Sequence, residues 1–69
     1  MAIPTLKNDV WIGTNAVIVG GITIGNNVLI APNSYVTDDV PDNSIVTGNP
    51  MTIIPNKNAT EGYINNRID

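Results

Sequence analysis

An aliphatic residue returns at every sixth position through the first half of this chain. The series comprises Leu6, Ile12, Ile18, Ile24, Ile30 and Val36. Because Ile, Val and Leu make up 20 of the 69 residues, six consecutive matches in any of the six registers are expected by chance roughly 4 times in 1,000. The repeat therefore indicates a solenoid in which each unit is a short strand followed by a turn.

The residue three places after each aliphatic predicts a corner in every unit. This column consists of Asp9, Asn15, Gly21, Asn27, Asn33 and Asp39. Asn, Asp and Gly are the residue types that most readily adopt a positive φ angle. On this interpretation Asn27 serves only as a corner residue, so glycine should replace it with little effect.

Two further columns predict which side chains face inward and which outward. The residue four places after each aliphatic forms a second inward column: Val10, Ala16, Ile22, Val28, Ser34 and Val40. The residue between two inward positions should point outward, because side chains alternate along a strand. That outward column is Trp11, Val17, Thr23, Leu29, Tyr35 and Pro41.

Two other fold classes fit this pattern less well. An antiparallel sheet of hairpins has no reason to keep a period of six, and only Gly20-Gly21 and Gly25-Asn26 approach hairpin turn chemistry. A helical fold is disfavoured because Gly, Asn and β-branched residues dominate and no helical stripe occurs. The chain is therefore expected to be all-β.

Short motifs accompany the repeat. They are IG-x-x-A at Ile12–Ala16, G-x-x-IG at Gly21–Gly25, V-x-x-DVP at Val36–Pro41 and GNP at Gly48–Pro50. With these motifs the segment resembles the carboxy-terminal part of hexapeptide-repeat acyltransferases, most closely serine acetyltransferases. The resemblance implies a left-handed parallel β-helix with three hexads per coil, and assembly as a homotrimer.

A coil of three hexads predicts which inward residues stack on one another. The expected pairs are Leu6 with Ile24, Ile12 with Ile30, Ile18 with Val36, and Ile22 with Val40. Only about two coils and a terminal cap fit into residues 1–54, which is too little core for a stable monomer. Apolar pairs in the outward column, Trp11 with Leu29 and Val17 with Tyr35, are the expected trimer contacts.

Residues 55–69 differ in character from the repeat. They are polar, Asn-rich and without periodicity, and are expected to form a mobile tail. The whole chain has a net charge of −3 with three basic residues, which argues against nucleic acid or anionic membranes as partners. No apolar run approaches a membrane span and no signal peptide is evident, so a cytoplasmic protein is expected.

The sequence contains no histidine. In the resembled family a histidine takes the proton from the acceptor hydroxyl as it attacks the thioester of acetyl-CoA, and it belongs to coils upstream of the matched segment. The carboxylates Asp9, Asp38, Asp39 and Asp42 occur at expected turns and are interpreted as turn residues. The resemblance thus implies a carboxy-terminal piece of an acetyl-CoA-dependent O-acetyltransferase, with no catalytic residue of its own and inactive alone.

The resemblance also implies that part of this piece contacts coenzyme A in a groove between two solenoids. The matching positions are Thr14, Ala31, Pro32, Thr37 and Asp38, with Lys57 as a cation for the phosphates. Asp38, Thr52 and Pro55 depart from relatives that often carry basic residues there. Lys57 and Arg67 are the late cations that remain, so the phosphate end of the groove should bind weakly.

Two alternative functions are compatible with the repeat, and a third, ice binding, is disfavoured. The chain could be a non-catalytic remnant that acts as an assembly or binding module, or a fragment of a sugar or polysaccharide O-acetyltransferase. An ice-binding solenoid would need ranks of threonine on one flat face, and Thr14, Thr23 and Thr37 form no such rank. No metal site is expected.

Overall fold

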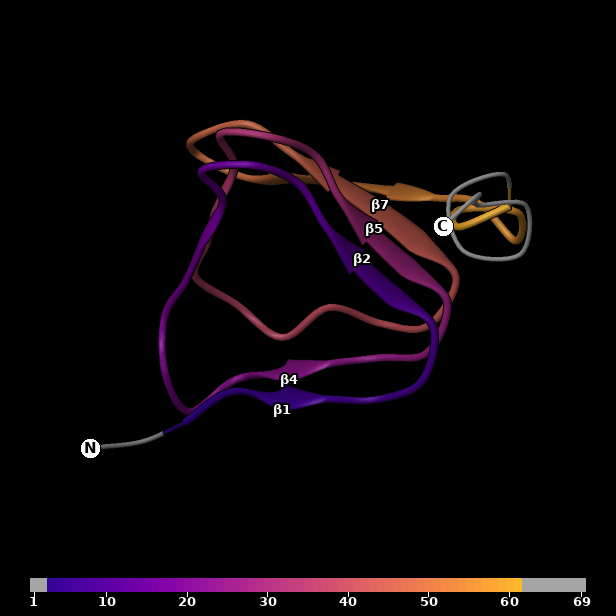
Figure 1. Cartoon of the computed structure of the whole chain (residues 1–69), viewed down its shortest axis with the longest axis horizontal. Helices are drawn as coiled ribbons and strands as arrows, with labels where there is room; N and C mark the ends of the chain where they lie inside the picture. The colour runs from indigo at the N-terminus through magenta and orange to yellow at the C-terminus, as the bar shows by residue number, and fades with distance from the viewer. Residues whose placement is uncertain (1–2, 62–69) are drawn as a thin grey trace.

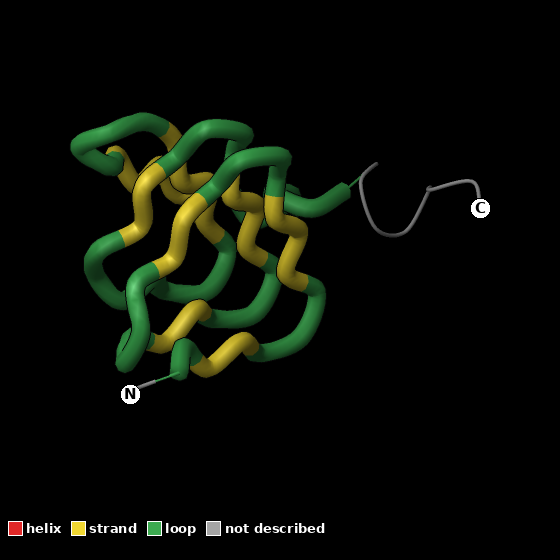
Figure 2. Tube along the Cα trace, turned by 60° about the vertical axis from the view of Figure 1, so that its left-hand side comes forward, coloured by secondary structure: helices red, strands yellow, loops and turns green. Residues whose placement is uncertain are grey.

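The computed structural model describes residues 3–61, and this part of the chain winds around three sides of a triangle (Figure 1). Its strands are β1 (Thr5–Leu6), β2 (Val10–Ile12), β3 (Val17–Ile18), β4 (Thr23–Ile24), β5 (Val28–Ile30), β6 (Tyr35–Val36), β7 (Ser44–Thr47) and β8 (Thr52–Pro55). No helix occurs among these described residues. Figure 2 shows the short strands of successive coils lying side by side, separated by turns.

Each side of the triangle is a small sheet whose strands come from successive coils. The sheets have the orders β1-β4, β2-β5-β7-β8 and β3-β6. Parallel pairing places Leu6 beside Ile24, Ile12 beside Ile30 and Ile18 beside Val36. These three registers confirm the predicted spacing of eighteen residues per coil. The fold is the expected left-handed parallel β-helix.

The corners follow the predicted column for the first five units. Positive φ angles occur at Asp9, Asn15, Gly21, Asn27 and Asn33. The prediction is wrong for Asp39, which is not among the residues with positive φ. Instead, its carboxylate oxygen Oδ1 accepts a 2.8 Å hydrogen bond from the backbone N–H of Thr23. In the coil below, the equivalent N–H of Thr5 bonds a backbone carbonyl, that of Ile22.

This substitution of a carboxylate for a carbonyl accompanies a shorter last coil. Val40 stacks on Ile24, sixteen residues earlier, and not on Ile22 as predicted. The next corner is Asn43, sixteen residues after Asn27, with a φ of 57°. The repeat therefore loses two residues between Val36 and Asn43 without losing contact between the coils.

The carboxyl-terminal end of the solenoid is closed by a strand that reverses direction. β7 adds a third parallel tier beside β5, and β8 pairs antiparallel with β7. The turn between them contains Gly48, with a φ of 88°, and a cis Asn49–Pro50 peptide bond. The predicted two coils are thus extended on one side, and the expected boundary between residues 54 and 55 falls inside β8.

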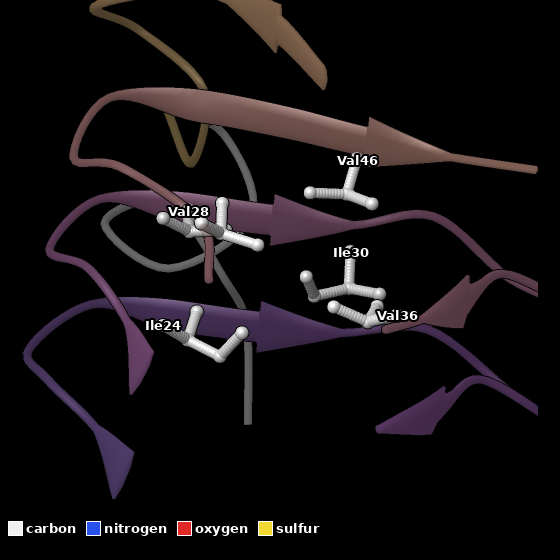
Figure 3. Packing of buried hydrophobic residues seen from close by; sticks show 6 residues of the cluster. Ile24, Val28, Ile30, Val36 and Val46 are labelled. Carbon is white, nitrogen blue, oxygen red and sulfur yellow. The ribbon is translucent and has the colours of Figure 1, made fainter. Parts of the chain in front are cut away.

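The core lies between the three sheets, in the second and third tiers. Its buried members are Ile24, Val28, Ile30, Val36, Val40 and Val46, and Figure 3 shows several of them converging between the strands. Two inward residues of the first coil are exposed, because Leu6 is 46% and Ile12 is 41% accessible to solvent, while Val10, Ala16 and Ile18 are partly buried against the core. The amino-terminal end of the described solenoid is therefore open, whereas the other end is closed.

Candidate functional site

The residues predicted to contact coenzyme A begin with a strip at the corner between β5 and β6. The carbonyl oxygen of Thr14 accepts a 2.9 Å hydrogen bond from the N–H of Asn33, which stacks the two coils there. Pro32 lies directly against Gly13, because a Cβ atom added to Gly13 would sit 2.6 Å from the Pro32 nitrogen. Thr14 and Pro32 are exposed and Ala31 is half-buried. The structure thus brings three predicted residues together on a flat strip of small side chains.

Ser34 fixes this strip to the closed end of the solenoid. Its buried hydroxyl group donates to the carbonyl oxygen of Ala31 at 2.7 Å and accepts from the N–H of Gly48 at 3.2 Å. The carbonyl oxygen of Gly48 in turn accepts a hydrogen bond from the N–H of Tyr35. The backbone of the strip is therefore held by the turn that precedes β8.

Thr37 and Asp38 lie at a different corner, between β6 and the side that carries β4. Both residues are exposed. The N–H of Thr37 points at the sulfur of Met51 at 3.3 Å, and its hydroxyl group lies 3.7 Å from the same atom. Met51 is half-buried and packs against the core, so it closes the solenoid beside this corner.

Lys57 lies at the third corner, in the segment after β8, which Figure 1 shows outside the triangle of strands. Its carbonyl oxygen accepts a 2.8 Å hydrogen bond from Nδ2 of Asn27. The same nitrogen donates to Oδ1 of Asn43 at 2.8 Å, while Oδ1 of Asn27 accepts from both the N–H and the hydroxyl group of Thr60. Arg67, the other predicted cation, lies outside the described residues.

These four contacts correct the interpretation of Asn27 as a replaceable corner residue. Its side chain holds residues 57–60 against the solenoid, and Ala59 and Thr60 are buried there. Periodicity could not reveal this role, because Thr60 lies outside the repeat. The predicted spacing of eighteen residues would stack Asn27 on Ile45, so the bond between the amides of Asn27 and Asn43 could not be predicted either.

The six predicted residues therefore occupy three corners of one chain: Thr14, Ala31 and Pro32 at the first, Thr37 and Asp38 at the second, and Lys57 at the third. No pocket is found among residues 3–61. A small molecule could be enclosed at any of these corners only with the help of a second surface.

In the described part of the chain there is also no helix able to cross a membrane, and no grouping of side chains suited to a metal ion.

The outward apolar pairs lie in the predicted register but differ in exposure. Trp11 pairs with Leu29, and Val17 pairs with Tyr35. Leu29 is only 8% exposed, whereas Val17 and Tyr35 are 48% and 39% exposed. Val17 and Tyr35, on the side formed by β3 and β6, are therefore more accessible to a second chain than Leu29 is.

Comparison with known proteins identifies the class to which this solenoid belongs. Residues 4–38 match the family model described as bacterial transferase hexapeptide (six repeats). This match covers more than half of the chain, and the chain belongs to this family. The corner residues and the stacked aliphatic residues described above occupy the recurring positions of that repeat.

Individual relatives match most of the chain. It is 46% identical over 50 residues to a galactoside O-acetyltransferase of Escherichia coli (strain K12), covering 72% of this chain and 25% of the relative. It is 41% identical over 56 residues to a 2,3,4,5-tetrahydropyridine-2,6-dicarboxylate N-acetyltransferase of Staphylococcus aureus (strain JH9), covering 81% of this chain and 23% of the relative. The chain thus spans about a quarter of the length of these relatives.

A solved structure shows the same fold with a ligand. The chain is similar to a hexapeptide-repeat-containing acetyltransferase from Vibrio cholerae O1 biovar eltor in complex with acetyl coenzyme A, with a TM-score of 0.75 and 42% sequence identity. The match covers 80% of this chain and 30% of that chain.

Proposed function

We propose that this chain forms the carboxy-terminal coils of an acetyl-CoA-dependent acetyltransferase and supplies part of the surface that binds the coenzyme. The observation that supports the proposal most directly is its 42% identity to a solenoid solved with acetyl coenzyme A. Family membership and the relatives named above, both acetyltransferases, agree with this class of donor.

The arrangement of the predicted residues suggests that two chains make the groove. Thr14, Ala31 and Pro32 at one corner offer small side chains against which a pantetheine arm can lie closely. Thr37 and Asp38 are exposed at another corner, where they can complete the groove of an adjacent chain. We place the contact between chains on the Val17 and Tyr35 side, with Trp11 and Leu29 at its margin, and expect the closed assembly to be a trimer.

The chemical step needs groups that this chain lacks. It has no histidine, so general-base assistance, worth roughly 10²–10⁴-fold in rate, has to come from elsewhere. The acceptors named for the two relatives are a galactoside and a dicarboxylic acid. Because relatives with such different acceptors share the segment matched here, we place acceptor selection in the part of the enzyme that this chain does not match.

Two acceptor classes remain as proposals. A serine acceptor follows from the motif resemblance alone. A sugar hydroxyl follows from similarity to a relative, the 46% identity to a galactoside O-acetyltransferase, and not from any acceptor-binding residue of this segment. A cytoplasmic location accompanies both, because acetyl-CoA is the proposed donor.

The proposal can be tested by titrating the folded chain with coenzyme A and following backbone amides by NMR. We expect shifts at Thr14, Ala31 and Thr37, whereas Pro32 has no amide proton to report. Free acetate is the control for the acetyl group alone. Absence of any shift at millimolar coenzyme A, or shifts confined to residues 57–60, would contradict the assignment of the surface.

A further inference from the structure

The turn that joins β7 to β8, residues 48–51, contacts two corners of the solenoid. At its beginning, the N–H of Gly48 bonds to the hydroxyl group of Ser34, beside the strip predicted to bind coenzyme A. At its end, the sulfur of Met51 receives the N–H of Thr37 at a different corner. We propose that this turn, anchored by Ser34, holds the two corners in a fixed relative position, and that Ser34 is thereby a positioning residue for the coenzyme surface.

Ser34 is a polar residue in an inward column that otherwise holds Val, Ile and Ala. It is only 1% exposed. A buried hydroxyl group is unfavourable unless it is hydrogen-bonded. The hydroxyl group of Ser34 meets this requirement twice, because it donates to the carbonyl oxygen of Ala31 at 2.7 Å and accepts from the N–H of Gly48 at 3.2 Å. One side chain therefore joins the strip to the turn.

Gly48 is held through both of its backbone polar groups. Its N–H donates to the hydroxyl group of Ser34, and its carbonyl oxygen accepts from the N–H of Tyr35 at 3.1 Å. Its φ of 88° lies in the left-handed region, which favours glycine. One coil below, the N–H of Val17, which is stacked under Tyr35, bonds to the backbone carbonyl of Ser34. The turn thus supplies to the second coil the acceptor that the second coil supplies to the first.

Met51 connects the other end of the turn to the corner of Thr37. The nitrogen atom of Thr37 lies 3.3 Å from the sulfur of Met51, and its hydroxyl oxygen lies 3.7 Å from the same atom. A thioether is a weak acceptor, so these contacts persist only while the backbone of the turn keeps Met51 in place. A shift of Gly48, three residues earlier in the chain, should therefore loosen Thr37 before it disturbs the core.

The consequence of this arrangement for coenzyme A rests on the proposed function. In a closed assembly each chain supplies its strip to one groove and Thr37 to the next, so the two corners must keep a fixed relative position. Binding contacts lose much of their value when the contacting groups are displaced. Ser34 is buried and touches no ligand in this arrangement. It acts on the two corners through Gly48 and Met51.

Amide hydrogen exchange, followed by NMR on the folded chain without coenzyme, tests the role of the turn directly. In Ser34→Ala the N–H of Gly48 loses its acceptor, and we expect the amides of Tyr35 and Thr37 to exchange about fivefold faster, because the turn opens locally. The amide of Gly13, which bonds to the second coil, serves as the reference for global unfolding. Exchange at Thr37 should rise relative to this reference.

Ser44→Ala is the matched control, because both serines of the chain are equally buried. Ser44 is 1% exposed and its hydroxyl group donates to the carbonyl oxygen of Asp42 at 3.2 Å, but it lies at the start of β7, at the opposite end of that strand from the turn. Its loss should leave exchange at Thr37 unchanged. Gly48→Ala loosens the turn from its own side, because a positive φ strains a residue with a Cβ atom, and it should act on Thr37 as Ser34→Ala does.

Titration with coenzyme A tests the consequence for binding. We expect Ser34→Ala to bind coenzyme A about fivefold more weakly than the wild type, the net effect of one hydrogen bond, and Ser44→Ala to bind as the wild type does. A wild-type chain that binds no coenzyme A would contradict the proposed function, and the exchange measurements would then decide the role of the turn alone. Unchanged exchange at Thr37 in a folded Ser34→Ala or, where that variant does not fold, in Gly48→Ala would overturn the proposal. Equal effects of Ser34→Ala and Ser44→Ala on exchange, or wild-type affinity in a folded Ser34→Ala, would also overturn it.

Discussion

The hydroxyl group of Thr60 donates a 2.6 Å hydrogen bond to Oδ1 of Asn27, thirty-three residues earlier in the chain. The other end of the Asn27 amide donates to Lys57 and Asn43. Both polar atoms of this half-buried amide are thus used, and the segment that carries Lys57 is held at one corner. Lys57 follows the last strand, and it can contribute to a binding surface on the solenoid only because the hydrogen bonds to Asn27 fix the position of its backbone.

Replacing Asn27 by glycine should therefore destabilise the protein. Glycine keeps the positive φ angle of the corner but removes all four side-chain hydrogen bonds. We expect the free energy of unfolding to fall by about 1–3 kcal/mol, since the net worth of such bonds is modest. Urea unfolding followed by circular dichroism, at one protein concentration throughout, measures the change.

Asn33→Gly is the matched control for this prediction. Asn33 has a φ of 63° at an equivalent corner and is exposed to solvent. Its replacement should alter stability by no more than about 0.5 kcal/mol. Equal effects of the two substitutions would show that the contacts of Asn27 with residues 57–60 contribute nothing to stability.

Close packing at Gly13 predicts that a larger residue at this position destabilises the protein. A Cβ atom at this position would lie 2.6 Å from the nitrogen and 2.9 Å from the Cα atom of Pro32. These are backbone atoms of a rigid ring residue and cannot turn aside, so Gly13→Ala should force the coils apart and cost about 1–3 kcal/mol. Gly20→Ala, at an exposed glycine whose φ is not positive, should leave the melting temperature nearly unchanged. A Gly13→Ala variant as stable as wild type would mean that the coils can separate freely at this corner.

The columns of the repeat predicted the fold well because each column has one structural role: a corner, an inward position or an outward position. Ile24 and Ile30 could be placed in the core and Asn15 at a corner from spacing alone. The prediction failed where the repeat itself changes, after Val36. There the carboxylate of Asp39 replaces a backbone carbonyl, and the sequence does not reveal whether an Asp will form a corner or serve as an acceptor.

The candidate site was less predictable than the fold. Thr14 and Pro32 stack because they are eighteen residues apart, so their proximity follows from the period. The position of Lys57 depends instead on contacts between residues of unrelated spacing, such as Asn27 with Thr60. Such contacts leave no periodic signal. In the proposed groove the different corners meet only through a second chain, and the repeat pattern of a single chain does not predict where that second chain lies.

Exposure of the β3 and β6 side predicts where side-by-side assembly can be broken. Val17 is 48% exposed beside Tyr35, so Val17→Lys places a charge in the proposed trimer contact at little cost to the single chain. We expect the molar mass to fall by a factor of about three, because an unpaired buried charge at a contact is strongly unfavourable. The control is Thr5→Lys on the β1 side, which is also exposed. An unchanged mass for Val17→Lys would move the contact to another side.

The negative charge of Asp38 predicts a weak affinity for coenzyme A that increases when the charge is reversed. This exposed carboxylate stands where the coenzyme's phosphates would approach in the proposed groove, and like charges in proximity raise the free energy of the complex. Asp38→Lys should tighten coenzyme A binding about tenfold and make the affinity fall more steeply with added salt, because exposed charges are screened. Isothermal titration calorimetry at two salt concentrations measures both effects. Glu61→Lys makes the same change in net charge at an exposed position four residues from Lys57 and not at the corner of Thr37 and Asp38, and should alter the affinity less than Asp38→Lys does. An equal gain in both variants would indicate attraction by net charge alone, and no gain in Asp38→Lys would remove this residue from the groove.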